Sequence, residues 1–441
     1  ARRVLAGLVI LVLLFVGGKF LWNLHKLFGG NIFGILNSTK LRGEDTGHVN
    51  ILLAGNSSDD IGHSGANLTD SMMLLSINTR DHTAFMLSLP RDLWVQVGDY
   101  GYEKLNAAYV TGETSGFNEK GYPHGGMGQL EKVVSDSLGI PVHYYALINY
   151  KALEQAVNAV GGVDITVDSD DPRGLYDPNT DWATGGVLVN LTNGRHHLNG
   201  RQALNLARAR GDSYNSYGFA ASDFDRTKHQ RQLLVALKNK AVSAGTVSNP
   251  GKLTKLSDAI GNNVKTDFKL PEVRRLYDLT KDIKGGSMRS LSLNDDNGQN
   301  LLASYAAPGG QSALIPAAGL DNFYEIQSFI SRQMSSDRVV REAADVVVLN
   351  GTTTDGLASK AKKKLTSKHI IVAQIGDAAG THKGTTIIDI SDSKKPSTKR
   401  ALKKIFGDHF TKTNPYAGIY DADFVVVLGQ DQIRPLTAKR N

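Results

Sequence analysis

The sequence predicts an α/β protein with more than one domain. Short runs of β-branched and other apolar residues alternate with segments whose apolar residues recur at helical spacing. This alternation is typical of sheets that are layered with helices. A chain of 441 residues is also too long for one ordinary hydrophobic core, so two or three domains are expected.

The first 24 residues predict a transmembrane anchor. Residues 4–18 carry no charge, and the apolar character continues after Lys19. A bilayer core needs about 20 apolar residues, which this stretch supplies if Lys19 reaches the interface. A cleaved signal peptide is the alternative, but no small-x-small cleavage site follows the apolar run. Two arginines before the run favour a cytoplasmic N-terminus, and residues 25–47 are expected to form a juxtamembrane spacer.

A globular domain is expected to begin at His48. Its predicted strands cover residues 49–55, 71–78, 82–90, 142–149 and 163–167. Its predicted helices cover residues 127–139, 150–160, 200–210, 225–243, 253–262, 271–283 and 321–334. Between them, residues 168–199 are polar and contain Gly and Pro, which predicts a long functional or disordered loop. Residues 306–319 form another stretch rich in Gly, Ala and Pro.

A second, smaller α/β domain is predicted over residues 343–435, after a linker at 335–342. Its strands are expected at 345–351, 369–376, 385–391 and 422–431, and its helices at 357–365 and 398–405. The sequence of this domain contains no convincing set of catalytic residue types. The lysines of its first helix are most simply a solvated face, and binding to a wall polymer is the alternative.

The composition limits which partners and which kinds of site the protein can have. The formal net charge is +7, and this modest excess favours anionic partners such as phosphates, nucleic acid or an anionic membrane surface. The sequence contains no cysteine. That excludes disulfides, thiolate metal sites and a cysteine nucleophile.

Charged residues border the predicted strands. Asp70 comes directly before one strand, and Arg91 and Asp92 follow directly after the next. The carboxyl ends of strands are where α/β folds place their sites. Lys104 lies a few residues further along the chain.

A closely spaced pair, Arg208 and Arg210, stands at the end of a predicted helix. Residues two apart do not share a helix face, so the two side chains converge only if the chain turns or becomes extended there. Gly211 permits such a turn. The next predicted helix contributes Arg226 and Gln230.

Several arginines with a lysine and an isolated aspartate are suited to a pyrophosphate. The guanidinium group donates two parallel hydrogen bonds to phosphate oxygens and keeps its charge. The carboxylate can share a divalent cation with the same oxygens. For any single arginine, an ordinary surface position is the simpler interpretation. Arg91 fits that interpretation less well, because it directly follows a buried strand.

Together these segments resemble the LytR–CpsA–Psr family of cell-wall glycopolymer transferases. The resemblance runs from about His48 to Ser243 and continues more weakly to Met334. Residues 343–431 resemble the LytR C-terminal domain that is often appended to this family. The resemblance implies an α-β-α sandwich over residues 48–334, held outside the bacterial cell membrane by a single-pass anchor.

The resemblance also implies an activity. Members of this family move a glycopolymer from a polyprenyl-pyrophosphate carrier to a hydroxyl of peptidoglycan and form a phosphodiester. The implied partners are that lipid-linked glycopolymer, peptidoglycan and the membrane, without nucleic acid. The implied cofactor is Mg²⁺ or another divalent cation.

Residue roles can be carried over by position. Asp70 matches the family's magnesium-binding aspartate, and Asp223 matches the aspartate of a later motif. The residues implied to be catalytic are Arg91, Asp92, Arg208 and Arg210, with Asp92 as a base or an orienting group. The residues implied to bind the pyrophosphate are Arg91, Lys104, Arg208, Arg210, Arg226 and Gln230.

This sequence departs from the family pattern on the metal side. The first strand usually ends in Gly-x-Asp, but Asn56 and Ser57 follow the glycine here. Asp59 or Asp60 could replace that carboxylate, or Asp70 and the pyrophosphate could hold the ion alone. His229 stands where a second arginine is common.

The departure leaves two alternatives to a transferase. One is a non-catalytic protein that binds lipid pyrophosphate and regulates cell-wall assembly, and the other is a lipid pyrophosphatase. A DNA-binding regulator is disfavoured, because the sequence shows no helix-turn-helix pattern. A metal site at His196 and His197 is also disfavoured, because no third ligand is in view.

Overall fold

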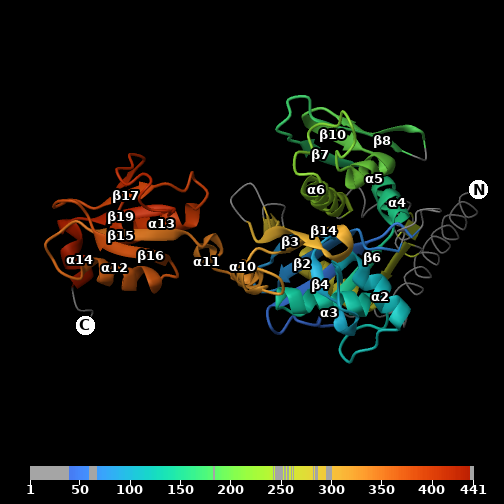
Figure 1. The fold of residues 1–441 in the computed structure, drawn as a ribbon, viewed down its shortest axis with the longest axis horizontal. Coiled ribbons are helices and arrows are strands. Elements are labelled where there is room, and N and C mark those ends of the chain that lie inside the picture. The colour runs from blue at the N-terminus through green and yellow to red at the C-terminus, as the bar shows by residue number, and fades with distance from the viewer. Residues whose placement is uncertain are drawn as a thin grey trace, which may run out of the picture. The chain divides into compact units, whose positions relative to one another are not determined.

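The computed structural model describes two compact units. The described residues are 39–58, 67–181, 184–241, 243, 252, 255, 258–259, 261, 263–281, 283, 287–294 and 300–437. One unit ends at Gln327 and the other begins at Ser328, so the division falls within helix α10 (Tyr324–Met334). Figure 1 labels the elements of both units.

The first unit is built on a six-stranded mixed sheet in the order β11-β6-β1-β2-β3-β12. Strands β1, β2 and β3 form an antiparallel meander, and β6 and β12 extend it as parallel neighbours of β1 and β3. The strand bounds are β1 His48–Gly55, β2 Ser71–Asn78, β3 Thr83–Leu89, β6 Tyr144–Ile148, β11 Val264–Thr266 and β12 Met288–Leu291. The strands predicted at 49–55, 71–78, 82–90 and 142–149 are therefore confirmed.

Helices cover both faces of this sheet. Val49 and Ile51 share a core cluster with Leu279 of α9, whereas Leu52 and Leu74 point to the opposite face because side chains alternate along a strand. Figure 1 shows α3 and α6 on opposite sides of the sheet. The helix bounds are α2 Ala108–Ser115, α3 Gly126–Leu138, α4 Tyr150–Val160, α5 Gly200–Arg208, α6 Asp223–Ala241 and α9 Leu270–Thr280. The α/β class expected from the sequence is confirmed.

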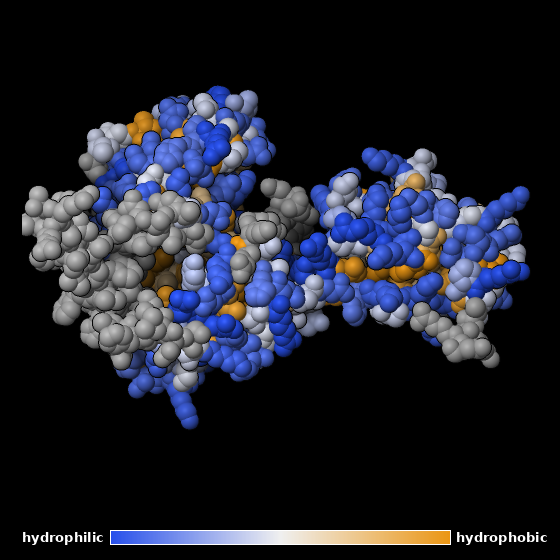
Figure 2. Space-filling view, turned by 180° about the vertical axis from the view of Figure 1, so that it is seen from behind, coloured by the Kyte–Doolittle hydropathy of each residue, from blue (hydrophilic) through white to orange (hydrophobic). Residues whose placement is uncertain are grey.

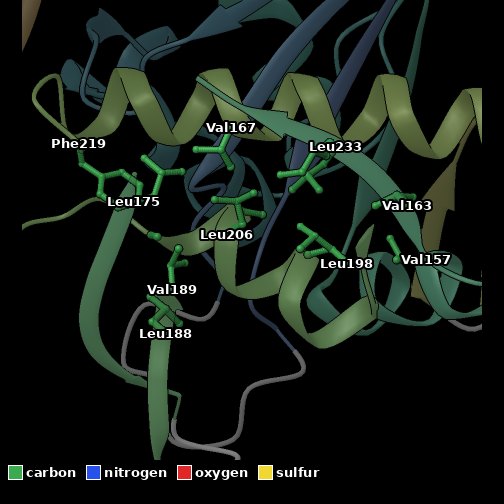
Figure 3. Close-up of a cluster of buried hydrophobic side chains, with 14 of the residues drawn as sticks. Val157, Val163, Val167, Leu175, Leu188, Val189, Leu198, Leu206, Phe219 and Leu233 are labelled. Atoms are coloured by element: carbon green, nitrogen blue, oxygen red, sulfur yellow. The ribbon is translucent and has the colours of Figure 1, made fainter. Parts of the chain in front are cut away.

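The loop predicted at residues 168–199 is wrong, because most of it is strand. Strand β8 (Leu175–Asp181) pairs with β9 (Gly186–Leu191), and β10 (Gly194–Leu198) pairs with β7 (Val163–Val167). Apolar residues at intervals along these strands join α4, α5 and α6 in one buried cluster, which Figure 3 shows in close-up. The Asp, Asn, Pro and Gly residues between them hide that pattern in the sequence.

The Gly/Ala/Pro-rich stretch at 306–319 also contains strands. Strand β13 (Leu302–Ala307) and strand β14 (Gln311–Pro316) form a hairpin, whose turn places Gly309 and Gly310 at positive φ. Trp94 packs against this hairpin from β4 (Trp94–Gln96), which pairs with β5 (Tyr102–Lys104). The helix predicted at 253–262 lies partly outside the described residues.

The second unit is a smaller α/β layer. Its five-stranded sheet has the order β16-β15-β19-β17-β18, and helices α12, α13 and α14 contribute to a core against it. The bounds are α11 Arg338–Glu342, β15 Asp345–Asn350, α12 Leu357–Thr366, β16 Ile371–Asp377, β17 Thr386–Asp389, α13 Pro396–Phe406, β18 Phe410–Thr411, β19 Phe424–Leu428 and α14 Ile433–Thr437. Figure 2 shows mainly hydrophilic surface on both units in that view, with smaller apolar areas.

The membrane anchor predicted for residues 1–24 lies outside the described residues. No helix among the described residues is long and apolar enough to cross a bilayer. Residues 39–47, the described part of the expected spacer, pack on the first unit. The side chain of Leu41 is buried there, and Glu44 forms an ion pair with Arg275 of α9.

The central strand β2 offers a test of this core. Leu74 is completely buried, so Leu74→Ala should lower the free energy of unfolding by about 2–5 kcal/mol through lost contacts and a residual cavity. Urea unfolding followed by tryptophan fluorescence reports on the first unit, because all three tryptophans precede Ser328 in the sequence and Trp94 is buried in this unit. The control Tyr214→Ala changes a side chain that is 90% exposed and should stay within about 0.5 kcal/mol. Equal stabilities of the two variants would contradict this packing.

Candidate functional site

A cavity of about 350 Å³ lies where β1, β2, α4, α5, α6 and the β8–β9 hairpin meet. Much of its wall is apolar and consists of Leu53, Ala54, Met73, Ile148, Leu153, Leu188, Leu204, Ala207, Leu233 and Leu234. Its polar lining consists of Asn56, Asp70, Ser71, Asn149, Asn179, Thr180, Arg208, Arg210, Asp212, Arg226 and Gln230. The cavity therefore joins an apolar chamber to a strongly charged region.

Arg208 and Arg210 both line the cavity because helix α5 ends between them. Arg208 is the last helical residue, and Ala209 has an extended conformation with φ −64° and ψ 134°. The chain then turns at Gly211, whose φ is +67°. The guanidinium carbon of Arg208 lies 5.1 Å from the centre of the Tyr150 ring, which supports the charge by a cation–π contact.

Arg226 is the most buried arginine of the site, with 4% of its surface exposed. Its Nη2 lies 2.7 Å from Oδ1 of Asp223, one turn earlier in α6, and donates a hydrogen bond of 2.9 Å to the backbone carbonyl of Asp70. Burial lowers the pKa of Arg226, and the neighbouring Arg210 and Arg91 lower it further, whereas Asp223 opposes the shift. Asp223 is also 3.6 Å from Nε of Arg210, so it links two arginines.

Asp70 is held by two donors. Its Oδ1 accepts hydrogen bonds from Nη1 of Arg91 at 2.9 Å and from Nδ2 of Asn106 at 3.2 Å. Burial opposes the charge of Arg91, but Asp70 and Asp92 outweigh this effect and raise its pKa. Arg91 therefore stays charged beside the cavity that Asp70 lines.

Asp92 and Lys104 form an outer pair next to Arg91. Nζ of Lys104 lies 2.7 Å from Oδ1 of Asp92, and Nε of Arg91 lies 3.4 Å from Oδ2 of the same carboxylate. The Asp92 carboxylate thus bridges Arg91 and Lys104 and can orient both side chains. None of these three residues lines the cavity itself. They are linked to it because Arg91 pairs with Asp70, which does line it.

Gln230 lines the cavity, but protein groups engage both ends of its amide. Its Oε1 accepts a hydrogen bond from the Ser71 hydroxyl at 2.7 Å, and its Nε2 donates to the carbonyl of Ala207 at 2.9 Å. The side chain thus ties α6 to the start of β2 and to the end of α5. The geometry gives Gln230 a bracing position in the cavity wall, and its contact with phosphate stays a prediction.

Several lining residues were missed by the sequence analysis. Asn56 and Asn149 follow directly after β1 and β6, so the rule that sites form at the carboxyl ends of strands could have found them. Asn179 and Thr180 belong to the hairpin that was expected to be a loop. Asp212 follows the turn after Arg210, and no local pattern in the sequence marks it.

A divalent cation would find few protein ligands in the described part of the chain. No group of three or more His, Cys, Asp or Glu side chains among these residues is arranged to hold a metal ion. Asp70 fits a cation only together with oxygens of a bound phosphate, since Mg²⁺ accepts one carboxylate plus substrate phosphates and water. Asp59 and Asp60 lie outside the described residues. His197 pairs with Asp164 at 3.0 Å on the surface.

Two family models match the chain. Residues 33–313 match the LytR_cpsA_psr family, and residues 343–431 match the family described as LytR cell envelope-related transcriptional attenuator.

Curated relatives are similar over 52–70% of this chain. The polyisoprenyl-teichoic acid–peptidoglycan teichoic acid transferase TagU of Oceanobacillus iheyensis is 33% identical over 52% of this chain and 61% of its own length. TagU of Enterococcus faecalis is 25% identical over 62% of this chain and 80% of its length. The cell wall biosynthesis protein LcpA of Corynebacterium glutamicum is 25% identical over 70% of this chain and 60% of its length. The chain thus spans about three fifths of the first and third relatives.

Among solved structures, protein gbs0355 from Streptococcus agalactiae is similar, with a TM-score of 0.50 at 25% identity. The match covers 68% of this chain and 91% of that protein. The crystal structure of TagV from B. subtilis gives a TM-score of 0.48 at 25% identity, over 65% of this chain and 97% of that one.

His229 provides a test of how tightly α6 packs behind the site. Burial lowers the pKa of His229 to about 4, and the positive charges of Lys228 and Arg231 contribute to this shift. The His229 ring packs edge-on against the Phe219 ring, with ring centres 5.6 Å apart. An unfolded histidine titrates near 6.5, so the stability from this neutral ring is complete above that pH and is lost as the pH falls towards 4. Between pH 7 and 5 the loss should be about 2 kcal/mol.

His229→Phe should remove that part of the pH dependence in urea unfolding at pH 7 and pH 5. His124→Phe, at an exposed position, is the matched control and should keep the wild-type pH dependence. If the wild type and His229→Phe lose the same stability between the two pH values, the neutral buried ring is ruled out.

Proposed function

We propose that this chain, which belongs to the LytR_cpsA_psr family, transfers a glycopolymer from a polyprenyl-pyrophosphate carrier to peptidoglycan outside the cell membrane. Relatives in that family are named as transferases of teichoic acid to peptidoglycan. The single observation that carries the proposal is the cavity whose apolar wall meets a set of arginines.

The apolar wall suits the lipid half of such a donor. Leu153 of α4, Leu204 of α5 and Leu233 of α6 line it together with Leu53 and Met73 of the sheet. Burying an isoprenoid chain against these side chains is favourable by about 25 cal/mol per Å² of apolar surface. A water-soluble sugar nucleotide would gain nothing from this wall.

The arginines suit the pyrophosphate half. Arg208, Arg210 and Arg226 line the cavity, and Arg91 stands behind Asp70. Bidentate, charge-assisted bonds from guanidinium groups favour phosphate oxygens over neutral ligands. Because Asp223 and Asp70 already balance part of this charge, the site can exist before the lipid binds and stays positive enough to attract it.

In the reaction, a hydroxyl oxygen of peptidoglycan attacks the phosphorus that carries the glycopolymer. The bond from that phosphorus to the bridging oxygen breaks, and polyprenyl phosphate departs with the hydroxyl proton. Arg208 and Arg210 stabilise the charge on the transferred phosphoryl group and on the departing phosphate, as in other phosphoryl transfers. Asp92 holds Arg91 and Lys104 in place beside them.

A divalent cation would be held by Asp70 and by oxygens of the bound pyrophosphate. When bound, it neutralises phosphate charge and makes the phosphorus more susceptible to attack. We also propose that the segment at 1–24 anchors the protein to the bacterial membrane, with the first unit on the outer side where the acceptor is found.

A transfer assay tests the function. The full chain in detergent receives a polyprenyl-pyrophosphate oligosaccharide, Mg²⁺ and peptidoglycan fragments, and mass spectrometry identifies the products. Oligosaccharide joined to peptidoglycan supports the proposal, and free oligosaccharide phosphate would indicate a pyrophosphatase. Bound lipid without any product would indicate the regulatory alternative and contradict an enzyme.

Variants assign the activity to the arginines. Arg208→Ala and Arg210→Ala should each lower the rate at least about 100-fold, because each removes a charged donor from the transition state. The matched control is Arg201→Ala on the same helix, where the guanidinium pairs with Glu154 away from the cavity. Full activity in Arg208→Ala and Arg210→Ala, or an equal loss in Arg201→Ala, would refute the assignment.

Cation binding should depend on the lipid. Manganese used as an EPR probe should bind weakly to the free protein and at least about tenfold more tightly with polyprenyl pyrophosphate, because Asp70 alone is a poor site. Asp70→Asn should remove most of the gain. Equally tight binding with and without the lipid would show that the protein holds the cation by itself.

A further inference from the structure

The chain that follows Arg208 is held by a carboxylate from another strand. The last helical hydrogen bond of α5 runs from the Ala209 N–H to the Asn205 carbonyl at 3.0 Å. The next two backbone N–H groups, those of Arg210 and Gly211, both donate to Oδ2 of Asp177, at 3.1 and 3.0 Å. Asp177 thus takes the place of the helix carbonyls that these N–H groups would otherwise meet.

Asp177 is unusual in its surroundings. Its side chain is 0% exposed, and among the described residues it forms no ion pair with a lysine or arginine. A buried carboxylate is costly unless hydrogen bonds stabilise its charge. Asp177 accepts a third such bond, from the Asn179 N–H to Oδ1 at 3.0 Å. Backbone N–H groups therefore stabilise the buried carboxylate, a role that a lysine or arginine usually fills.

The strand that carries Asp177 also forms part of the cavity. The pairing of β8 with β9 shifts register between Asp177 and Thr180, and in this bulge Asn179 and Thr180 turn to line the cavity. Nδ2 of Asn179 donates to Oδ1 of Asp212 at 3.2 Å. Hydrogen bonds from the bulge therefore hold the turn that follows Arg210 at two points, at Arg210 and Gly211 through Asp177 and at Asp212 through Asn179.

The rest of β8 fixes the chain beyond the turn. Tyr176 and Tyr217 exchange two backbone hydrogen bonds of 3.0 Å each, and their rings stack with centres 5.2 Å apart. Leu175 and Phe219 belong to the same buried cluster, where Figure 3 labels both. The three backbone hydrogen bonds that Asp177 accepts, called the clamp below, thus come from a strand that pairing and packing hold in place, as a positioning group requires.

We propose that Asp177 is a positioning residue, which ends α5 and thereby directs Arg208 and Arg210 together into the cavity. Without it, the two N–H groups can continue the helix, and residues two apart on a helix point to different faces. The identity of the ligand rests on the function proposed above, whereas the clamp itself rests on the geometry.

Asp177→Asn is the informative change, because it keeps the shape and removes one acceptor. The neutral amide has one oxygen and one NH₂ group, so the NH₂ group faces either the Arg210 and Gly211 N–H groups or the Asn179 N–H, and the oxygen that remains is a weaker acceptor than a carboxylate. Asp181→Asn is the matched control, since Asp181 is buried on the same strand and bonds Thr184 instead of the loop after α5. If Asp177→Asn does not fold, Asp177→Ser is measured in its place, because the shorter hydroxyl fits without reaching both N–H groups.

The first measurement is amide hydrogen exchange of the full chain in detergent without ligand. The amides of Arg210 and Gly211 should be protected in the wild type and in Asp181→Asn, and at least about tenfold less protected in Asp177→Asn, while α6 keeps its protection. Unchanged protection at these two amides would overturn the proposal.

The second measurement compares the affinities for polyprenyl pyrophosphate, polyprenyl monophosphate and polyprenyl alcohol. Asp177→Asn should lose at least about tenfold of the preference for pyrophosphate over monophosphate, with binding of the alcohol unchanged. A preference equal to that of the wild type, an equal loss for all three lipids, or failure of both variants to fold would leave Asp177 a purely structural residue and overturn the proposal. A wild type without this preference would contradict the proposed function, and hydrogen exchange would still decide on the clamp.

Discussion

The site depends on bringing arginines close together beside an apolar chamber. Like charges repel, and the repulsion grows as water is excluded, so such a cluster is stable only with carboxylates placed among its members. Asp223 lies between Arg226 and Arg210, and Asp70 lies beside Arg91. The carboxylates keep the arginines charged and in place, but they do not cancel all of the positive charge. The proposed pyrophosphate would neutralise the positive charge that remains.

The same constraint explains why the elements meet as they do. Helix α6 brings Arg226 against the start of β2, and Gln230 one turn later braces it to Ser71 and to the end of α5. Helix α5 must stop at Arg208 for its second arginine to reach the cavity. The β8–β9 hairpin lines one part of the chamber and carries Asp177, whose carboxylate accepts hydrogen bonds from the chain just after Arg208. Polar and apolar parts of the site therefore come from the same few elements.

The sequence predicted the α/β class and most strands of the central sheet, because runs such as residues 71–78 are continuous and apolar. The arginines could be named from their motifs, and the need for a break after Arg208 followed from helix geometry. The hairpin at β8 and β9 could not be predicted, since its few apolar residues are spaced by Asp, Asn, Pro and Gly. The bracing position of Gln230 depends on contacts with Ser71 and Ala207, which only the folded chain brings together.

The most direct test of the central claim is a crystal structure of the protein with a bound polyprenyl pyrophosphate. The lipid chain should lie along Leu53, Leu153 and Leu233, with phosphate oxygens within hydrogen-bonding distance of the Arg208 and Arg210 guanidinium groups. A lipid bound outside this cavity, or one whose phosphates point away from the arginines, would contradict the account.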